Sequence, residues 1–342
     1  MSTPKDRAVA NTLSEEVLAQ LPAIPPSAKV GFIKAVGYLF GGVANYIAAW
    51  TRRPTQSVDD KTDAKSIVTQ AVAKAAAKSA AENPELVEAA VQAWLPKELR
   101  RQENKAKVVE YAATDLSGED EATNANKQDI SDDWLNAFER YCEDASSDKM
   151  RQLWGRVLAG EVKSPGSFSK ATIRFLSELD ISIAKSFEAM SGRIIGSNLF
   201  VLDANNQNAE LGELLELEAA GLISGVGGFL SWTPDLEEDG IFVLSGAQFG
   251  LVGHVSNNVA PSIQTMTVTG VGQQITKILP APDERATLDE IAKGLKEQDG
   301  NFIRKAEITG VALCKVVKNS VGQTSLQKLA VVWGDDPFER RN

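Results

Sequence analysis

A series of amphipathic segments in the middle of the chain constrains its fold most strongly. Ser131-Asp-Asp-Trp offers a hydroxyl for an N-cap and acids for the first turn, which favours a helix start. Further helices are predicted to begin at Ser147, Ser169 and Asp180. Because the connections between them are short, neighbouring helices must pack against one another. Apolar residues at helical spacing predict the buried stripes of this module. They include Trp134, Leu135, Phe138, Cys142, Met150, Leu153, Trp154, Val157, Leu158, Ile173, Leu176, Phe187 and Met190.

Three further helices are predicted before Ser131. Residues 59–81 are rich in alanine with scattered lysines and favour a long solvated helix. Pro84 begins a second helix that runs to Trp94, and a third is expected from Lys97 to Leu116.

The hydrophobic period changes after Ile195. A helix is expected from Glu210 to Ala220, ended by Gly221 in a left-handed conformation. Short strands, a wing-like turn and another helix then resemble a winged-helix topology. The predicted strands are 222–223, 228–232, 241–244 and 265–269, with a helix over 270–279, a helix from Arg285, and final strands around 308–317 and 326–333.

These patterns predict an α+β protein, mostly helical, in four segments. The 342 residues exceed what one small core needs. We expect an N-terminal arm with an apolar, glycine-rich helix (1–58), a helical module (59–195), a winged-helix-like module (196–280) and a C-terminal α/β extension (281–342).

The charge distribution argues against a nucleic-acid partner. The formal net charge is -10, from 46 acidic and 36 basic residues. Between Arg193 and Lys277 there is no lysine or arginine, while the same interval holds nine carboxylates. Binding to a duplex needs several cationic contacts with phosphate, so the predicted wing favours a protein contact.

The segment from Val30 to Trp50 is the candidate interaction site. Large apolar residues fall on one helical face and small ones on the other, but only 17 uncharged residues separate Lys34 from Arg52. That is short for a membrane span, which needs about 20 apolar residues. A buried helix, a self-association face and peripheral membrane contact all stay open as interpretations. The residues of this candidate face are Phe32, Val36, Gly37, Leu39, Phe40, Gly41, Val43, Ile47 and Trp50.

No pattern indicates a catalytic, cofactor or metal site. Cys142 and Cys314 are the only cysteines, so a disulfide framework is excluded, and the N-terminus has no secretory signal. We therefore expect a cytoplasmic protein, with membrane association left open. His254 is expected in an exposed loop, and Gly270-x-Gly272 is interpreted as a strand-to-helix turn. Gly225-x-Gly-Gly228 is expected to be a flexible wing tip.

Two neighbouring motifs carry a family resemblance. They are Leu153-Trp-x-x-Val-Leu-Ala-Gly-Glu161 and Pro165-Gly-Ser-Phe-Ser169. Together with the region from about Val87 to Leu279, they resemble an uncharacterised family, a domain of unknown function found in bacteria and prophage-like contexts. The resemblance implies no activity and no catalytic residues. On architecture alone, the chain is also similar to alpha-type abortive-infection proteins.

The leading functional hypothesis is a non-enzymatic protein-interaction or assembly protein of bacterial or prophage origin, with phage defence as the process considered. Its expected partner is another protein or a second copy of the chain. The alternatives are a membrane-acting effector that uses residues 30–50, and a winged-helix transcriptional regulator, which the cation-free acidic wing disfavours.

Overall fold

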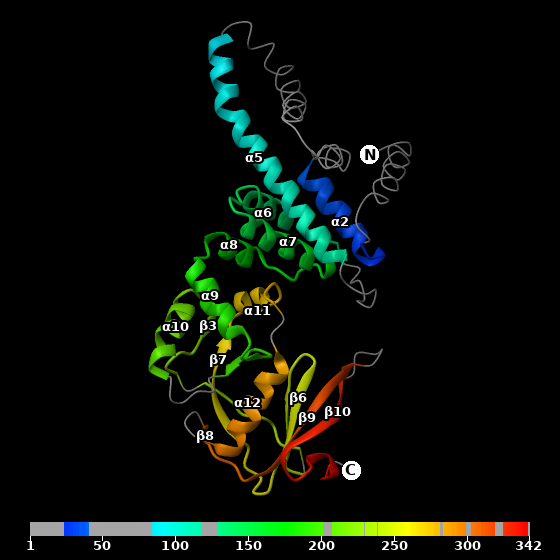
Figure 1. Cartoon of the computed structure of the whole chain (residues 1–342), viewed down its shortest axis with the longest axis vertical. Helices are drawn as coiled ribbons and strands as arrows, with labels where there is room; N and C mark the ends of the chain where they lie inside the picture. Colours follow the sequence, from blue (N-terminus) through cyan, green and yellow to red (C-terminus); the bar gives the residue numbers. More distant parts are fainter. Residues whose placement is uncertain are drawn as a thin grey trace. The chain divides into compact units, whose positions relative to one another are not determined.

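The computed structural model divides the chain into two compact units, with the boundary in the sequence between Ser177 and Glu178. Figure 1 shows the elements of each unit. The structure describes residues 24–40, 84–117, 129–200, 207–228, 230–237, 239–280, 283–298, 302–318 and 324–340.

The first unit is helical throughout its described residues. Helix α2 belongs to the predicted N-terminal arm and α7 to the predicted helical module, and the two helices pack together. Its helices are α2 (Pro26–Leu39), α5 (Pro84–Ser117), α6 (Asp132–Cys142), α7 (Asp148–Lys163) and α8 (Lys170–Glu178).

Helix α5 is one continuous element, so the prediction of two helices with a break near Pro96 was wrong. A proline removes one backbone hydrogen bond and often kinks a helix, but it does not force the chain out of it. The second half of α5 is fixed by close packing on α7. Gly155 permits that contact, because a Cβ there would lie 2.5 Å from the Cβ of Tyr111.

Aromatic side chains form the centre of the first unit. Phe138 and Trp154 are buried and meet edge to face, with ring centroids 5.7 Å apart. Trp134 stacks on Phe138, and its indole nitrogen donates to the carbonyl of Phe168 at 2.7 Å. The helical stripes predicted around these residues are confirmed as core, except that Met150 and Leu153 are half-buried.

The two predicted serine caps behave differently. At α7 the hydroxyl of Ser147 accepts a hydrogen bond from the amide of Met150, as expected. Ser131 is the residue before α6, but its side chain makes no capping hydrogen bond. The helix start at Asp132 is right, and the role predicted for the Ser131 hydroxyl is wrong. Asp132 and Asp133 in the first turn still stabilise the start of α6, because their negative charges lie at the positive end of the helix dipole.

The second unit combines four helices with two antiparallel sheets in its described residues. Its helices are α9 (Ile181–Ser191), α10 (Gln207–Ala219), α11 (Gly270–Thr276) and α12 (Glu284–Glu297), and η1 (Pro337–Arg340) is a 3-10 turn. Its strands are β1 (Ile194–Ile195), β2 (Asn198–Phe200), β3 (Ile223–Ser224), β4 (Ser231–Trp232), β5 (Ile241–Ser245), β6 (Phe249–Val255), β7 (Ser262–Val268), β8 (Phe302–Arg304), β9 (Ile308–Lys318) and β10 (Thr324–Gly334).

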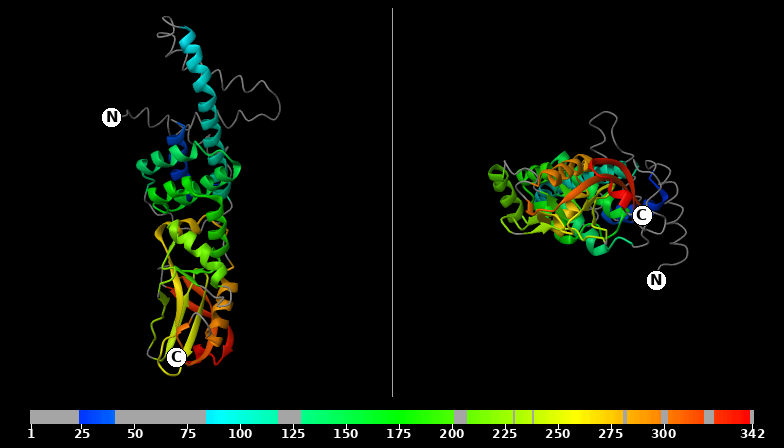
Figure 2. Two further views of the ribbon diagram at one scale, coloured as in Figure 1. Left: turned by 90° about the vertical axis from the view of Figure 1, so that its left-hand side faces the viewer. Right: turned by 90° about the horizontal axis from the view of Figure 1, so that it is seen from below.

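Strand β7 organises the first sheet, and β6 and β9 organise the second. In the described residues β2, β3, β4 and β8 all pair with β7, and β1 pairs with β2. The second sheet has the order β10-β9-β6-β5. Its long hairpin of β9 and β10 is the orange-to-red pair of ribbons that runs side by side in Figure 2.

The expected two-stranded wing is not formed from the segments proposed for it. Strand β4 pairs with β7, whereas β5 pairs with β6, so residues 228–232 and 241–244 belong to different sheets. Sequence periodicity identifies strands but carries little information on which ones pair.

Two glycine predictions are confirmed at helix ends. Gly221 follows α10 with a φ of 82°, a conformation that glycine adopts without steric cost. Gly272 lies at the start of α11, where a Cβ would collide with the carbonyl oxygen of Leu222. Gly270-x-Gly272 is thus a strand-to-helix turn, with Thr269 as its cap.

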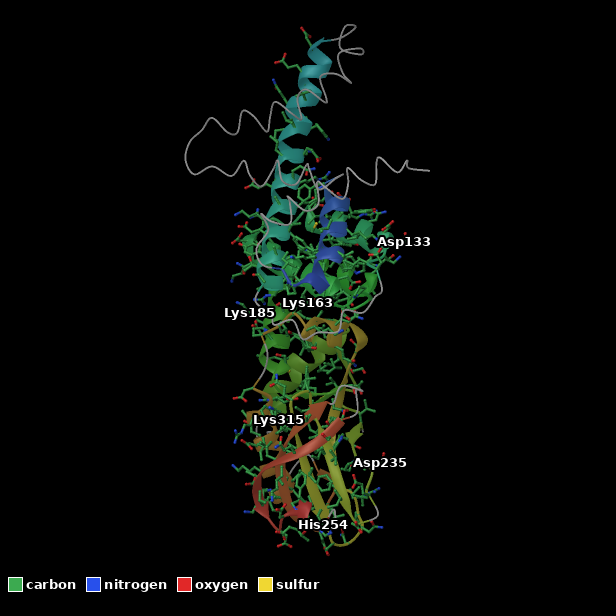
Figure 3. All side chains as sticks on the ribbon, turned by 90° about the vertical axis from the view of Figure 1, so that its right-hand side faces the viewer. Asp133, Lys163, Lys185, Asp235, His254 and Lys315 are labelled. Atoms are coloured by element: carbon green, nitrogen blue, oxygen red, sulfur yellow. The ribbon has the colours of Figure 1, made fainter. Side chains whose placement is uncertain are left out.

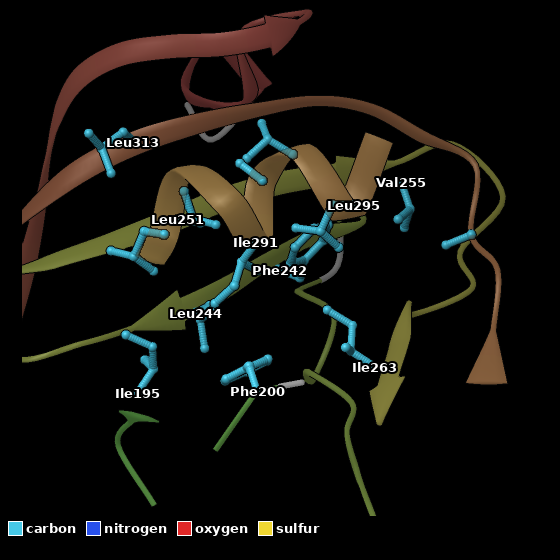
Figure 4. Close-up of a cluster of buried hydrophobic side chains, with 14 residues drawn as sticks. Ile195, Phe200, Phe242, Leu244, Leu251, Val255, Ile263, Ile291, Leu295 and Leu313 are labelled. Atoms are coloured by element: carbon cyan, nitrogen blue, oxygen red, sulfur yellow. The ribbon is translucent and has the colours of Figure 1, made fainter. Parts of the chain in front are cut away.

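The core of the second unit lies between α12 and the second sheet (Figure 4). Ile291 and Leu295 of α12 meet Phe242, Leu251 and Leu313 there. This core joins residues from both sides of position 280, so the segments expected at 196–280 and 281–342 share one interior. The predicted α+β class, with a helical module followed by a sheet-rich C-terminal part, is confirmed.

Replacing Ile291 with alanine should test this shared core. Ile291 is fully buried, so Ile291→Ala should lower the free energy of unfolding by about 2–5 kcal/mol. Urea unfolding followed by circular dichroism measures the loss, with the exposed Ile181→Ala on α9 as a control that should cost about 0.5 kcal/mol or less. Equal effects of the two variants would contradict the packing described.

Candidate functional site

The candidate face of residues 30–50 is largely internal where the structure describes it. Phe32, Val36 and Leu39 of α2 are buried in the first unit. Gly37 and Phe40 are half-buried. Gly41, Val43, Ile47 and Trp50 lie outside the described residues. The buried trio packs inward and is not available to a membrane or partner in this structure. Within the described ranges, no helix has the length and apolarity needed to cross a membrane.

A buried lysine fixes the end of α2. Lys105 of α5 donates to the carbonyl of Leu39 and to a carboxylate oxygen of Glu139, both at 2.9 Å. Its ammonium group also lies 5.7 Å from the ring centroid of Phe40. The ammonium group therefore binds a carbonyl at the negative end of α2. It is itself paired with the Glu139 carboxylate, as a buried charge requires.

Polar contacts beside Lys105 join α5 to the end of α6. Asn104 donates to the carbonyl of Glu143 at 2.7 Å and accepts from Arg151 of α7 at 2.9 Å. Burial raises the pKa of Glu143, and the nearby charges of Arg101 and Lys105 act in the opposite direction. These residues hold three helices together, which gives the cluster a structural role.

Glu161 explains the most specific sequence motif. Its carboxylate is buried at the end of α7 and accepts hydrogen bonds from the amides of Gly166 and Phe168, at 2.7 and 3.0 Å. Gly160 leaves room for the ring of Phe168, because a Cβ there would lie 2.7 Å from a ring carbon. The Ala-Gly-Glu and Pro-Gly-Ser-Phe sequences thus form one folded corner, with the glutamate bound to the backbone that follows it.

A second glutamate binds the glycine-rich loop after β3. The Glu218 carboxylate of α10 accepts from the amides of Gly225 and Val226, at 2.6 and 3.0 Å. Gly225 and Gly227 have positive φ angles, and Leu230 lies against Gly225. The loop predicted to be a flexible wing tip is therefore anchored to α10. A phosphate at the same amides would have to displace Glu218.

A third glutamate binds the turn between β5 and β6. Glu284, at the start of α12, accepts from the amides of Ala247, Gln248 and Phe249, at 2.5, 2.8 and 3.0 Å. Gly246 is required there because a side chain would overlap the carboxylate. This turn, the end of α11 and the start of α12 line a groove of about 640 Å³. The convergent amide donors of the groove are already satisfied by the protein.

His254 does not lie in an exposed loop, so that prediction was wrong. It is buried on β6, opposite Ile241 and Gly310 of the neighbouring strands, and is labelled in Figure 3. Its Nδ1 lies 2.7 Å from the hydroxyl of Thr309. The error arises because residues 249–255 carry glycines and a histidine and lack the alternation that marked the other strands.

Neither cysteine forms a disulfide, and both are buried. Burial raises the pKa of the Cys142 thiol above its usual range. Cys314 donates to the carbonyl of Gly250. In the parts of the chain described, His, Cys, Asp and Glu side chains form no group of three that could hold a metal ion.

The apolar surface of the second unit was missed by sequence reasoning. Leu211 and Leu215 of α10 are 41% and 49% exposed. On β10, Leu329, Val331 and Val332 are 38–45% exposed. The sequence signal was present, since α10 has leucines at more positions than one helix face can bury.

Removing the Glu161 charge should destabilise the first unit. Two amide donors lose a charged acceptor, and hydrogen bonds to charged groups contribute about 1.5–3 kcal/mol each, so Glu161→Gln should cost about 2 kcal/mol or more. Urea unfolding measures this, with the exposed Glu213→Gln as control. A loss no larger than that of the control would show that the motif glutamate is not a structural anchor.

Neither thiol should react while the protein is folded. Burial and the raised pKa of Cys142 suppress its thiolate, and the thiolate is the reactive form. Titration with a chromogenic disulfide reagent near pH 8 should detect almost no thiol in buffer and both thiols in urea. Rapid reaction of Cys142 in buffer would contradict its burial.

Comparison with known proteins gives one match. The model of a family described as "Protein of unknown function (DUF2806)" matches residues 91–216, which is less than half of the chain. This region runs from α5 to α10 and includes the corner built on Glu161. No curated protein and no solved structure matches the chain. The central part of this protein is therefore similar to a family of unknown function.

Proposed function

We propose that this is a non-enzymatic protein-interaction or assembly protein that associates with a second copy of itself. The proposal rests on one observation, the exposed apolar strand β10. The resemblance of the central motifs to a bacterial and prophage-associated family supports a bacterial or prophage origin. A role in phage defence is part of the same proposal, on that resemblance and on the architecture.

Strand β10 is an edge strand with apolar side chains in contact with solvent. In the described residues it pairs with β9 and ends the order of its sheet. Leu329, Val331 and Val332 are between 38% and 45% exposed. An edge strand of 11 residues with unpaired backbone groups and exposed apolar side chains is a template for another strand.

A second copy of β10 is the proposed occupant of this edge. Lys328 is already paired with Asp336 of the same chain, so the contact is expected to depend on backbone hydrogen bonds and apolar side chains. Antiparallel pairing across a two-fold axis lets the same apolar residues of the two strands meet. Two-fold dimers are also the commonest homo-oligomers, and they use the same patch on both subunits.

Two irregularities in β10 limit the length of strand that can pair with a second copy. The register with β9 shifts between Lys328 and Ala330 and again between Val331 and Trp333. Such bulges increase the local twist and interrupt a long ladder. We therefore expect a reversible dimer held by a short paired stretch and the exposed valines.

Three glutamates that bind the backbone support the non-enzymatic part of the proposal. Glu161, Glu218 and Glu284 each bind backbone amides of a neighbouring loop. The same contacts occupy the amide donors that an anionic substrate would use.

Lysines on the exposed edge should prevent self-association. Sedimentation velocity over a range of concentrations should show a reversible dimer for the native chain and a monomer for Val331→Lys/Val332→Lys, because like charges would oppose the pairing of two edges. Leu230→Lys, on another surface and similarly exposed, is the matched control and should dimerise normally. A native chain that stays monomeric at all concentrations, or a control that dissociates equally, would contradict the proposal.

A further inference from the structure

The second sheet carries an apolar core on each of its two faces, and the two cores differ greatly in size. Successive residues of a strand point to opposite faces, so Leu251 and Leu313 face α12 while Val252 and Cys314 face the other way. Among the described residues, the core beside α12 contains 14 buried side chains. The core on the opposite face contains three, which are Ile241, Val252 and Cys314. Loss of the smaller core would leave most of the buried apolar surface of this unit in place.

The single turn η1 covers the smaller core. It packs on β6 and β9, and its Phe338 contacts the cluster of Ile241, Val252 and Cys314. These three side chains are at most 1% exposed, while Phe338 itself is only half-buried. One partly solvated aromatic ring therefore contributes much of the apolar contact between η1 and the sheet.

Few polar contacts hold η1 in place. The amide of Asp335 donates to the carbonyl of Thr309 at 3.0 Å. The carboxylate of Asp336 accepts from the amide of Phe338 at 3.0 Å and forms an ion pair with Lys328 of β10. Because the Lys328 side chain is 44% exposed, dissolved salt can weaken this ion pair.

From these contacts we propose that η1 is a latch, which opens locally and uncovers Ile241, Val252 and Cys314 while the rest of the unit stays folded. Proteins open in local units, and segments with few buried apolar contacts open most easily. Opening of η1 loses the contacts of Phe338 and one ion pair, whereas opening of α12 exposes the whole larger core. The latch controls access to the Cys314 thiol, which is a property separate from the proposed self-association.

Thiol labelling of the full-length protein tests this latch. The protein is kept in buffer with an alkylating reagent, and labelling of Cys314 is followed over hours by mass spectrometry of its peptide. Ala292→Cys supplies the reference, because it places a thiol at a fully buried position of the larger core. Cys314 should react about tenfold faster than this reference thiol or more, because it needs only the local opening. Equal rates at the two positions would overturn the proposal.

Two variants of η1 identify the contacts that keep it closed. Phe338→Ala removes the apolar cover and should speed the labelling of Cys314 by about tenfold. Asp336→Asn removes the ion pair but keeps an oxygen that can accept from the Phe338 amide, so it should cause a smaller increase. Added salt should speed the labelling of the native chain and have little effect on Asp336→Asn.

A matched control separates the latch from a general loss of charge on the sheet. Lys315→Gln removes an exposed lysine from β9 and should leave the labelling rate of Cys314 within about twofold of the native rate. None of these changes should speed the labelling of the reference thiol, and circular dichroism checks that each variant folds. Variants of Phe338 and Asp336 that label no faster than this control would show that η1 does not guard the thiol.

Hydrogen exchange gives a second measurement that needs no thiol. The amides of Asp335 and Phe338 should exchange with much less protection than the amides that join β6 to β9, because they are released when η1 alone opens. Phe338→Ala should lower the protection of the Asp335 amide and leave the β6–β9 amides unchanged. Equal protection of both groups in the native chain would mean that η1 opens only with the sheet, which would contradict the latch.

Discussion

The structure depends on glutamates whose carboxylates bind the backbone amides of neighbouring loops. Glu161, Glu218 and Glu284 each accept two or three amide hydrogen bonds, from loops that follow α7, β3 and β5. Each loop needs glycine, either for a positive φ or because a side chain would collide with its neighbour. A charged acceptor makes these hydrogen bonds stronger than neutral ones, so three tight turns are fixed without ligands. The same interaction explains why a protein with several glycine-rich loops has its loop amides occupied.

Much of the helical part could be predicted because its signals are local. The cap at Ser147 and the apolar stripe of α7 each depend on residues close together in the sequence. Gly221 ends α10 because a glycine adopts the positive φ needed there without steric cost, and this can be predicted from the residue type. The motif around Glu161 could be identified as specific, but its role could not be predicted. The hydrogen bonds from Gly166 and Phe168 depend on how the corner closes, which no spacing rule describes.

The misplaced features depend on contacts between distant residues. His254 is buried because β6 lies between β5 and β9, and β9 comes more than 50 residues later in the chain. The prediction of a two-stranded wing was wrong for the same reason, since β4 and β5 are near in sequence but join different sheets. Pro96 is a separate case, because the residues beside it are mostly exposed and the helix continues through it with the loss of one backbone hydrogen bond. Leu211 and Leu215 could not be assigned to the surface until the structure showed which leucines of α10 face inward.

The loop amides bound by Glu218 and Glu284 serve the fold and are not an anion-binding site. Inorganic phosphate or a nucleotide can be titrated into isotope-labelled protein while the amide resonances of Gly225, Val226 and Ala247 to Phe249 are followed by NMR. No concentration-dependent shift is expected at these amides, because Glu218 and Glu284 already occupy them. Saturable shifts confined to either loop would contradict it and would identify an anionic ligand site.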